Sequence, residues 1–125
     1  MRFGEALVIV LAAMIAAGAV LFLRGCGVRL PGGYELVQPT SDYFVIAHRP
    51  DDYSIIEGNV EGYKVIGNTI VGYAGPPPPP AGPVETGYFI IRGHRIIQGL
   101  SKKQWLAHLN AYGISEEPHL DIPRR

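Results

Sequence analysis

TGYFIIRGHRIIQGLSKKQWLAHLNAYGI, residues 86–114, is the stretch that decides the fold of this chain. Its two runs of aromatic and β-branched residues, YFII and II, favour extended backbone. Gly93 stands at the first central position between them, where a two-residue type II′ turn needs a positive φ. The stretch therefore predicts a hairpin in which Ile96 lies opposite Ile91.

A helix is predicted to follow this hairpin directly. Ser101 and Gln104 have the spacing of a capping box, and Leu100 and Trp105 that of the hydrophobic staple across the same cap. Apolar residues then recur at helical spacing, which gives the helix one apolar face. Gly113 stands where a C-terminal cap needs a left-handed residue. These local signals agree with one another, which is typical of a sequence that folds.

The start of the chain is apolar and predicts a membrane segment. Residues 6–23 carry no polar side chain, and at 1.5 Å per residue about 18 residues span roughly 27 Å, near the lower limit for crossing a bilayer. After a flank of residues 1–5, we therefore expect a transmembrane anchor or signal segment at 6–24. An uncleaved anchor is the first interpretation. A lipoprotein signal processed at Cys26 and ordinary signal cleavage near residues 17–19 are the alternatives.

The side of the membrane is poorly determined by charge, because arginines flank both ends of the apolar run. We expect the folded part to lie outside the cytoplasm, since the anchor and the lipoprotein interpretations share that arrangement. Residues 25–33, which contain Pro31-Gly32-Gly33, are predicted to form a linker.

Residues 34–114 are predicted to form a small α+β domain. Short apolar and alternating runs predict an antiparallel β-meander of five or six strands, with the one C-terminal helix packed on it. Five consecutive prolines within residues 75–83 favour a polyproline helix and predict a stiff strut between two hairpins. Residues 115–125 are charged and broken by proline, and we expect a flexible tail there.

Composition excludes several classes of function. The formal net charge is zero and no basic stripe is present, so nucleic acid is not an expected partner. The single cysteine, Cys26, permits no intramolecular disulfide, and the four histidines have no zinc-ligand spacing. Neither a nucleophile elbow nor a phosphate-binding loop occurs. We therefore predict no catalytic, cofactor-binding or metal-binding residues.

Two small basic groups are the candidates for contact with a partner. One is the tip of the last hairpin, because arginine binds carboxylate and phosphate groups well and hairpin tips are exposed. The other is a lysine pair in the first turn of the helix, where the helix dipole disfavours cations. The residues concerned are Arg92, His94, Arg95, Lys102 and Lys103.

The order of motifs resembles a family of small bacterial lipoproteins known only as a domain of unknown function. The likeness runs over residues 26–114: a cysteine soon after an apolar start, then LPGGYELV, an alternating β region, and GYFII followed by GLSKKQWLAHLNAYGI. It implies an envelope-anchored domain and favours lipid modification of Cys26. It implies no activity and no catalytic residue.

The expected function is that of a membrane-tethered binding or accessory protein of the bacterial cell envelope, similar in kind to an immunity or inhibitor protein. Its expected partners are the membrane and another envelope protein. The alternative is an enzyme of unfamiliar type, which would need at least two of His48, His94 and His108 to meet in a cleft with a carboxylate.

Overall fold

The computed structural model describes residues 27–49, 53–79 and 82–124. The predicted membrane segment at 6–24 and the predicted lipidation of Cys26 lie outside these residues. In the described part of the chain, no helix is long and apolar enough to cross a membrane.

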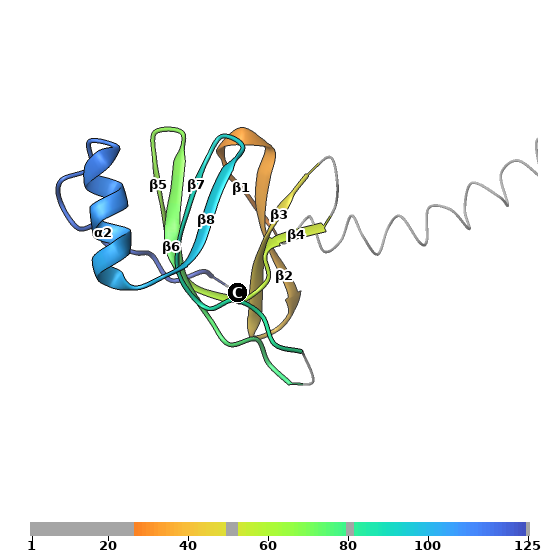
Figure 1. Ribbon diagram of the computed structural model, residues 1–125. Coiled ribbons are helices and arrows are strands. Elements are labelled where there is room, and N and C mark those ends of the chain that lie inside the picture. The colour runs from red at the N-terminus through yellow and green to blue at the C-terminus, as the bar shows by residue number, and fades with distance from the viewer. Residues whose placement is uncertain (1–26, 50–52, 80–81, 125) are drawn as a thin grey trace, which may run out of the picture.

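The described strands form two four-stranded antiparallel sheets (Figure 1). Sheet A contains, in spatial order, β1 (Val28–Arg29), β2 (Tyr34–Thr40), β3 (Tyr43–His48) and β4 (Tyr53–Ile56). Sheet B contains β5 (Asn59–Ile66), β6 (Thr69–Gly75), β7 (Gly87–Arg92) and β8 (Arg95–Leu100). A short 3-10 turn, η1 (Pro31–Gly33), joins β1 to β2, and helix α2 (Lys102–Ala111) follows β8.

The prediction of antiparallel strands followed by one packed C-terminal helix is confirmed, but the single meander of five or six strands is wrong. The chain leaves sheet A after β4 and begins sheet B at Asn59. Gly58 permits this crossing because a Cβ there would lie 2.8 Å from the carbonyl oxygen of Gly75. The Asn59 side chain then fixes the junction by accepting a 3.0 Å hydrogen bond from the backbone N–H of Phe44 in sheet A.

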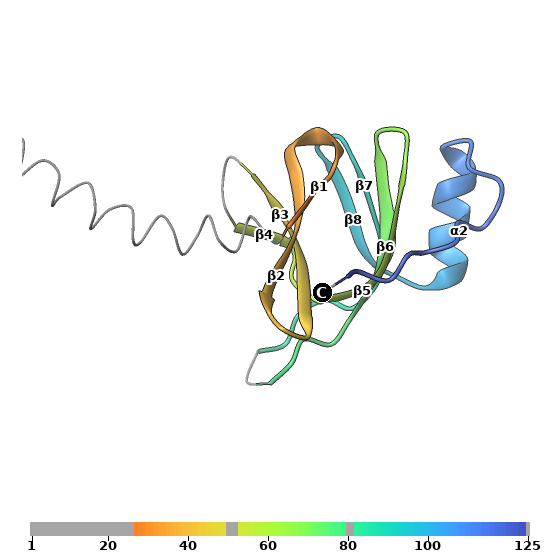
Figure 2. The ribbon, with the colours of Figure 1, turned by 180° about the vertical axis from the view of Figure 1, so that it is seen from behind.

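Three layers result, with sheet B in the middle (Figures 1 and 2). One core lies between the two sheets, and a second lies between sheet B and α2. The first contains Leu30, Tyr34, Leu36, Phe44, Ile46, Ile56, Val60, Ile70, Ala74, Phe89 and Ile91. The second contains Val71, Ile90, Trp105 and Leu109. Sheet B is therefore apolar on both faces.

The helix begins and ends as the sequence predicts. The Ser101 side chain accepts from the Gln104 N–H at 3.2 Å, and the Gln104 side chain accepts from the Ser101 N–H at 2.9 Å. Gly113 has a φ of +84°, and the Ile114 N–H donates to the Leu109 carbonyl at 2.9 Å, which is the Schellman cap.

The folded unit extends further at both ends than residues 34–114. Val28 pairs with Leu36, and Leu30 is buried in the first core, so part of the predicted linker belongs to sheet A. After the helix, Asp121 exchanges two backbone hydrogen bonds with Tyr63 of the edge strand β5, at 3.0 and 2.8 Å. The structure therefore gives a defined position to the segment for which the sequence predicts a flexible tail.

The proline-rich segment connects two neighbouring strands, because β6 and β7 pair along their length. It links the β5–β6 hairpin to the β7–β8 hairpin at one end of sheet B, and the stiffness of the predicted strut between these two hairpins stays a prediction. Pro39 lies inside β2, and the register of β2 against β3 shifts between Val37 and Thr40. This shift fits a proline that has no N–H to donate to the ladder.

Candidate functional site

The turn between β7 and β8 carries the predicted basic cluster, which we call the tip (residues 92–95). The register is the predicted one, with Ile91 opposite Ile96 and Arg92 opposite Arg95. Gly93 has a φ of +61°, which a side chain would disfavour, and a Cβ there would touch nothing within 4 Å. The tip is therefore a tight, exposed turn whose shape depends on glycine.

A hydrogen bond from the other sheet holds this tip. The phenol of Tyr34, in β2, donates to the carbonyl oxygen of Gly93 at 2.7 Å. Tyr34 is 4 % exposed, and burial raises the pKa of its phenol. Its ring also packs against the imidazole of His48, with ring centroids 4.9 Å apart. The tip is thus fixed to sheet A as well as to its own sheet.

Arg92 is held on the opposite side of sheet B. Its guanidinium carbon lies 4.5 Å from the ring centroid of Tyr112, the C-cap residue of α2, which is cation–π geometry. The Arg92 side chain is half-buried, whereas His94 and Arg95 are exposed. Of the three predicted tip residues, one is anchored to the helix and two are presented to solvent.

The predicted lysine pair lies elsewhere. Lys102 and Lys103 begin α2, at the end of the domain opposite to the tip (Figure 1). Lys102 pairs with Glu117 at 2.5 Å, and the hydrogen bond that its ammonium donates to this carboxylate raises the pKa of the lysine. Both lysines are exposed. The structure does not bring the five predicted contact residues into one surface, and it pairs one of the lysines within the chain.

The three histidines of the enzyme hypothesis are distributed over different elements. His48 ends β3 in sheet A, His94 is in the tip, and His108 is on α2, which covers the far face of sheet B. His108 borders a shallow hollow of about 290 Å³ with Gln104, Ala107 and Ala111 of the same helix. Among the residues that the structure describes, no three His, Cys, Asp or Glu side chains are grouped to hold a metal ion.

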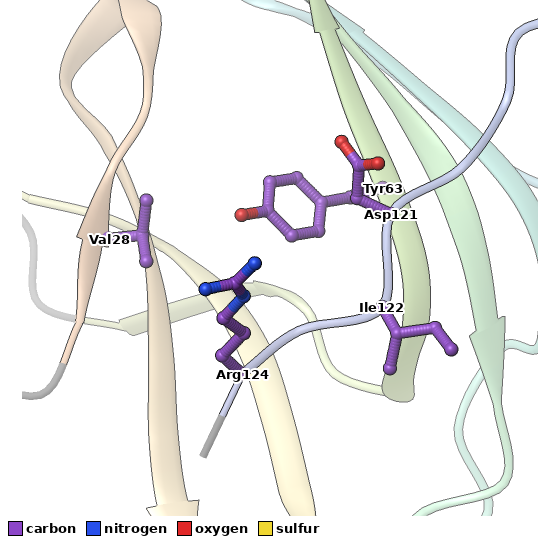
Figure 3. A pocket seen from close by; sticks show the side chains of 5 residues that line it. All are labelled: Val28, Tyr63, Asp121, Ile122 and Arg124. Carbon is purple, nitrogen blue, oxygen red and sulfur yellow. The ribbon is translucent and has the colours of Figure 1, made fainter.

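A hollow that sequence reasoning missed opens between the edge of sheet A and the edge of sheet B. It has a volume of about 430 Å³ and lies beside the C-terminal segment (Figure 3). We call it the edge groove, and its lining residues are Val28, Tyr63, Asp121, Ile122 and Arg124.

Apolar side chains are unusually exposed in the edge groove. Ile122 is 81 % exposed and Val28 is 44 % exposed, and the third large apolar residue exposed in the described chain is Val65. Val65 is two residues from Tyr63 on β5 and therefore shares its face of the strand. The only sequence signal of this patch is an isolated isoleucine in a charged tail, which does not reveal that the tail pairs with β5 and lines a hollow with Val28.

A third hollow, of about 290 Å³, lies between the edge of β4 and β8. Its lining includes two carboxylates, Glu57 and Glu85, next to the proline-rich connection. Among the described residues that line this hollow, no cation pairs with either carboxylate. The described residues also hold no group of three side chains suited to a metal there.

Comparison of the chain with known proteins gives no relative. No family model matches it, and no curated protein or solved structure is significantly similar to it. The likeness to a family of small bacterial lipoproteins therefore stays a prediction, and the function has to be argued from the geometry of the chain itself.

Proposed function

We propose that this chain is a membrane-tethered, non-enzymatic binding or accessory protein of the bacterial cell envelope, which contacts another envelope protein through the tip. The proposed tether is the apolar segment at residues 6–24, or a lipid on Cys26 if the chain is processed as a lipoprotein. In both cases the folded domain lies outside the cytoplasm.

The observation that carries the proposal is the fixed position of an exposed cationic turn. The Tyr34 hydrogen bond of 2.7 Å holds the Gly93 carbonyl, and the Arg92–Tyr112 contact holds the base of the turn. His94 and Arg95 remain exposed on this rigid base. A surface that is already ordered loses less conformational entropy on binding, so a preorganised turn suits recognition.

The chemistry of these side chains favours an acidic surface on the partner. The guanidinium of Arg95 can donate two parallel hydrogen bonds to one carboxylate. His94 adds an imidazole N–H that can donate a further hydrogen bond. The zero net charge of the chain argues against binding driven by a general field, so recognition would depend on these local groups.

The test uses the full-length protein in membranes of the cells that make it, with a photoreactive amino acid in place of Asn68 in the β5–β6 turn. Asn68 is exposed and lies in the turn next to the tip at the same end of sheet B (Figure 1). We expect one discrete crosslinked protein, and we expect Arg95→Glu to reduce its yield at least several-fold.

Lys103→Glu is the matched control, because it reverses one exposed positive charge at the opposite end of the domain. It should leave the yield unchanged. If Lys103→Glu reduced the crosslink as much as Arg95→Glu did, or if Arg95→Glu had no effect, the tip would not be the contact surface. Recovery of the intact chain from the aqueous fraction would contradict the proposed tether.

A further inference from the structure

The edge groove lies where the chain enters the folded domain. β1 is the first described strand, and Val28 in it lines the groove. The residues between the apolar run, which ends at Leu23, and this strand are the four residues 24–27. Four residues can span at most about 14 Å, even when fully extended.

This short connection limits how far the β1 edge can be from a bilayer. Each headgroup layer is about 5–8 Å thick, so a domain edge within about 14 Å of the hydrocarbon boundary reaches the headgroups or lies just above them. If residues 6–23 span the membrane, the β1 edge is the side of the domain nearest to the lipid. The groove is part of that side.

The composition of the groove fits such a boundary. The most exposed large apolar side chain of the described residues, Ile122, lies on one side of the groove, which Val28 and the half-buried ring of Tyr63 also line (Figure 3). Tyrosine is enriched at membrane–water interfaces because its ring is apolar and its hydroxyl is polar. An exposed isoleucine loses its unfavourable contact with water when it enters the acyl boundary.

The charges at the groove favour anionic lipid. Arg124 lines it and is exposed. The one acidic lining residue, Asp121, lies 3.5 Å from the Lys64 ammonium, so its charge is largely offset. An arginine beside exposed apolar groups is typical of a surface that lies on a membrane and attracts anionic headgroups.

We propose that the edge groove is a lipid-contacting surface, in which Ile122 and Val28 enter the headgroup–acyl boundary and Arg124 binds the phosphate of an anionic phospholipid. This surface would fix the orientation of the domain on the membrane, with its β1 edge facing the bilayer. The inference rests on the membrane tether of the proposed function and is independent of the protein contact at the tip.

The experiment uses the full chain reconstituted in vesicles of phosphatidylethanolamine and phosphatidylglycerol. A photoreactive benzoylphenylalanine replaces Ile122, and mass spectrometry measures the adduct between protein and phospholipid after irradiation. Ile122 is 81 % exposed, so the replacement should not disturb folding. The matched control carries the same amino acid in place of Ala107, an exposed position on α2 beyond the far face of sheet B.

We expect a phospholipid adduct at position 122 and little or none at position 107. In the chain that carries benzoylphenylalanine at position 122, Arg124→Glu should lower the ratio of docked to undocked domain by about fivefold or more in these vesicles. The yield of phospholipid adduct reports this ratio. The substitution should have much less effect in vesicles of phosphatidylcholine alone, which carry no net charge.

Four results would overturn the inference. Equal lipid adducts at positions 122 and 107 would show that the domain has no preferred face. A crosslink from position 122 to a second copy of the chain, with no lipid adduct, would assign the groove to an interface between copies. Failure of the chain to float with the vesicles would remove the tether and the inference together, whereas flotation without a lipid adduct would remove the inference alone.

Discussion

The phenol of Tyr34 donates a 2.7 Å hydrogen bond to the carbonyl oxygen of Gly93. These two residues are 59 positions apart in the sequence, and the bond between them joins the two sheets. Tyr34 starts β2 in sheet A, whereas Gly93 forms the turn between β7 and β8 in sheet B. The bond therefore makes the position of the exposed tip depend on the packing of the two sheets. A substitution at Tyr34 should therefore alter the position of the tip.

Tyr34→Phe removes this bond and leaves the buried ring in place. We expect the free energy of unfolding to fall by about 1 kcal/mol, because one net hydrogen bond is lost and a carbonyl loses its donor. Chemical denaturation checks the stability, and amide exchange at residues 93–95 checks the position of the tip. Tyr73→Phe, which removes the hydroxyl of a half-buried tyrosine on the helix side of sheet B, is the control. Equal exchange in the two variants would contradict the coupling.

The same residue predicts how stability depends on pH. Burial raises the pKa of Tyr34 above 10.0, its ordinary value, so above pH 10 the unfolded chain loses this proton while the folded chain keeps it. The folded state then binds more protons, and stability falls as the pH rises from about 10 through the raised pKa. Between pH 8 and pH 11, the free energy of unfolding should fall less in Tyr34→Phe than in the parent. Parallel curves would contradict this assignment.

Local signals in the sequence predicted the hairpin and helix of residues 86–114 well. The capping box at Ser101, the register of Ile91 against Ile96 and the glycine cap at Gly113 all depend on residues within a few positions of one another. Such features follow from backbone geometry, which a short stretch of sequence specifies completely. The structure therefore agrees with the sequence wherever the interaction is local.

The predictions that failed or fell short depend on contacts between distant residues. Nothing near Ile56 in the sequence shows that the chain changes sheets there, because the runs on both sides read equally well as strands of one meander. The tail is similar: Asp121 pairs with Tyr63 through backbone atoms, which carry no sequence signal. The edge groove depends on both, so it could not be predicted, whereas the exposed tip could.

Gly72 predicts a sharp intolerance to a larger residue at the centre of sheet B. A Cβ there would lie 2.3 Å from the carbonyl oxygen of Gly62 and 2.5 Å from Cζ of Phe89, which is fully buried. Neither the neighbouring strand nor the ring can move without disturbing the first core. We expect Gly72→Ala to destabilise the domain by about 1–3 kcal/mol or more through overpacking, as measured by chemical denaturation.

Gly82→Ala is the matched control for this substitution. A Cβ at Gly82 meets nothing within 4 Å, so the change should be neutral or slightly stabilising. Similar stabilities for the two variants would mean that Phe89 does not occupy the space above Gly72.

The last prediction concerns the segment that closes the edge groove. The backbone of Asp121 donates one hydrogen bond to Tyr63 and accepts another, whereas its side chain makes only an exposed 3.5 Å contact with Lys64. Asp121→Pro removes the backbone donor, and Asp121→Asn removes the charge alone. We expect the proline variant to lose about 1 kcal/mol of stability and to increase amide exchange at Tyr63. The asparagine variant should stay within about 0.5 kcal/mol of the parent, because exposed ion pairs contribute little. Equal exchange at Tyr63 in the two variants would show that the tail does not pair with β5 in solution, and the edge groove would then lose the wall that presents Ile122.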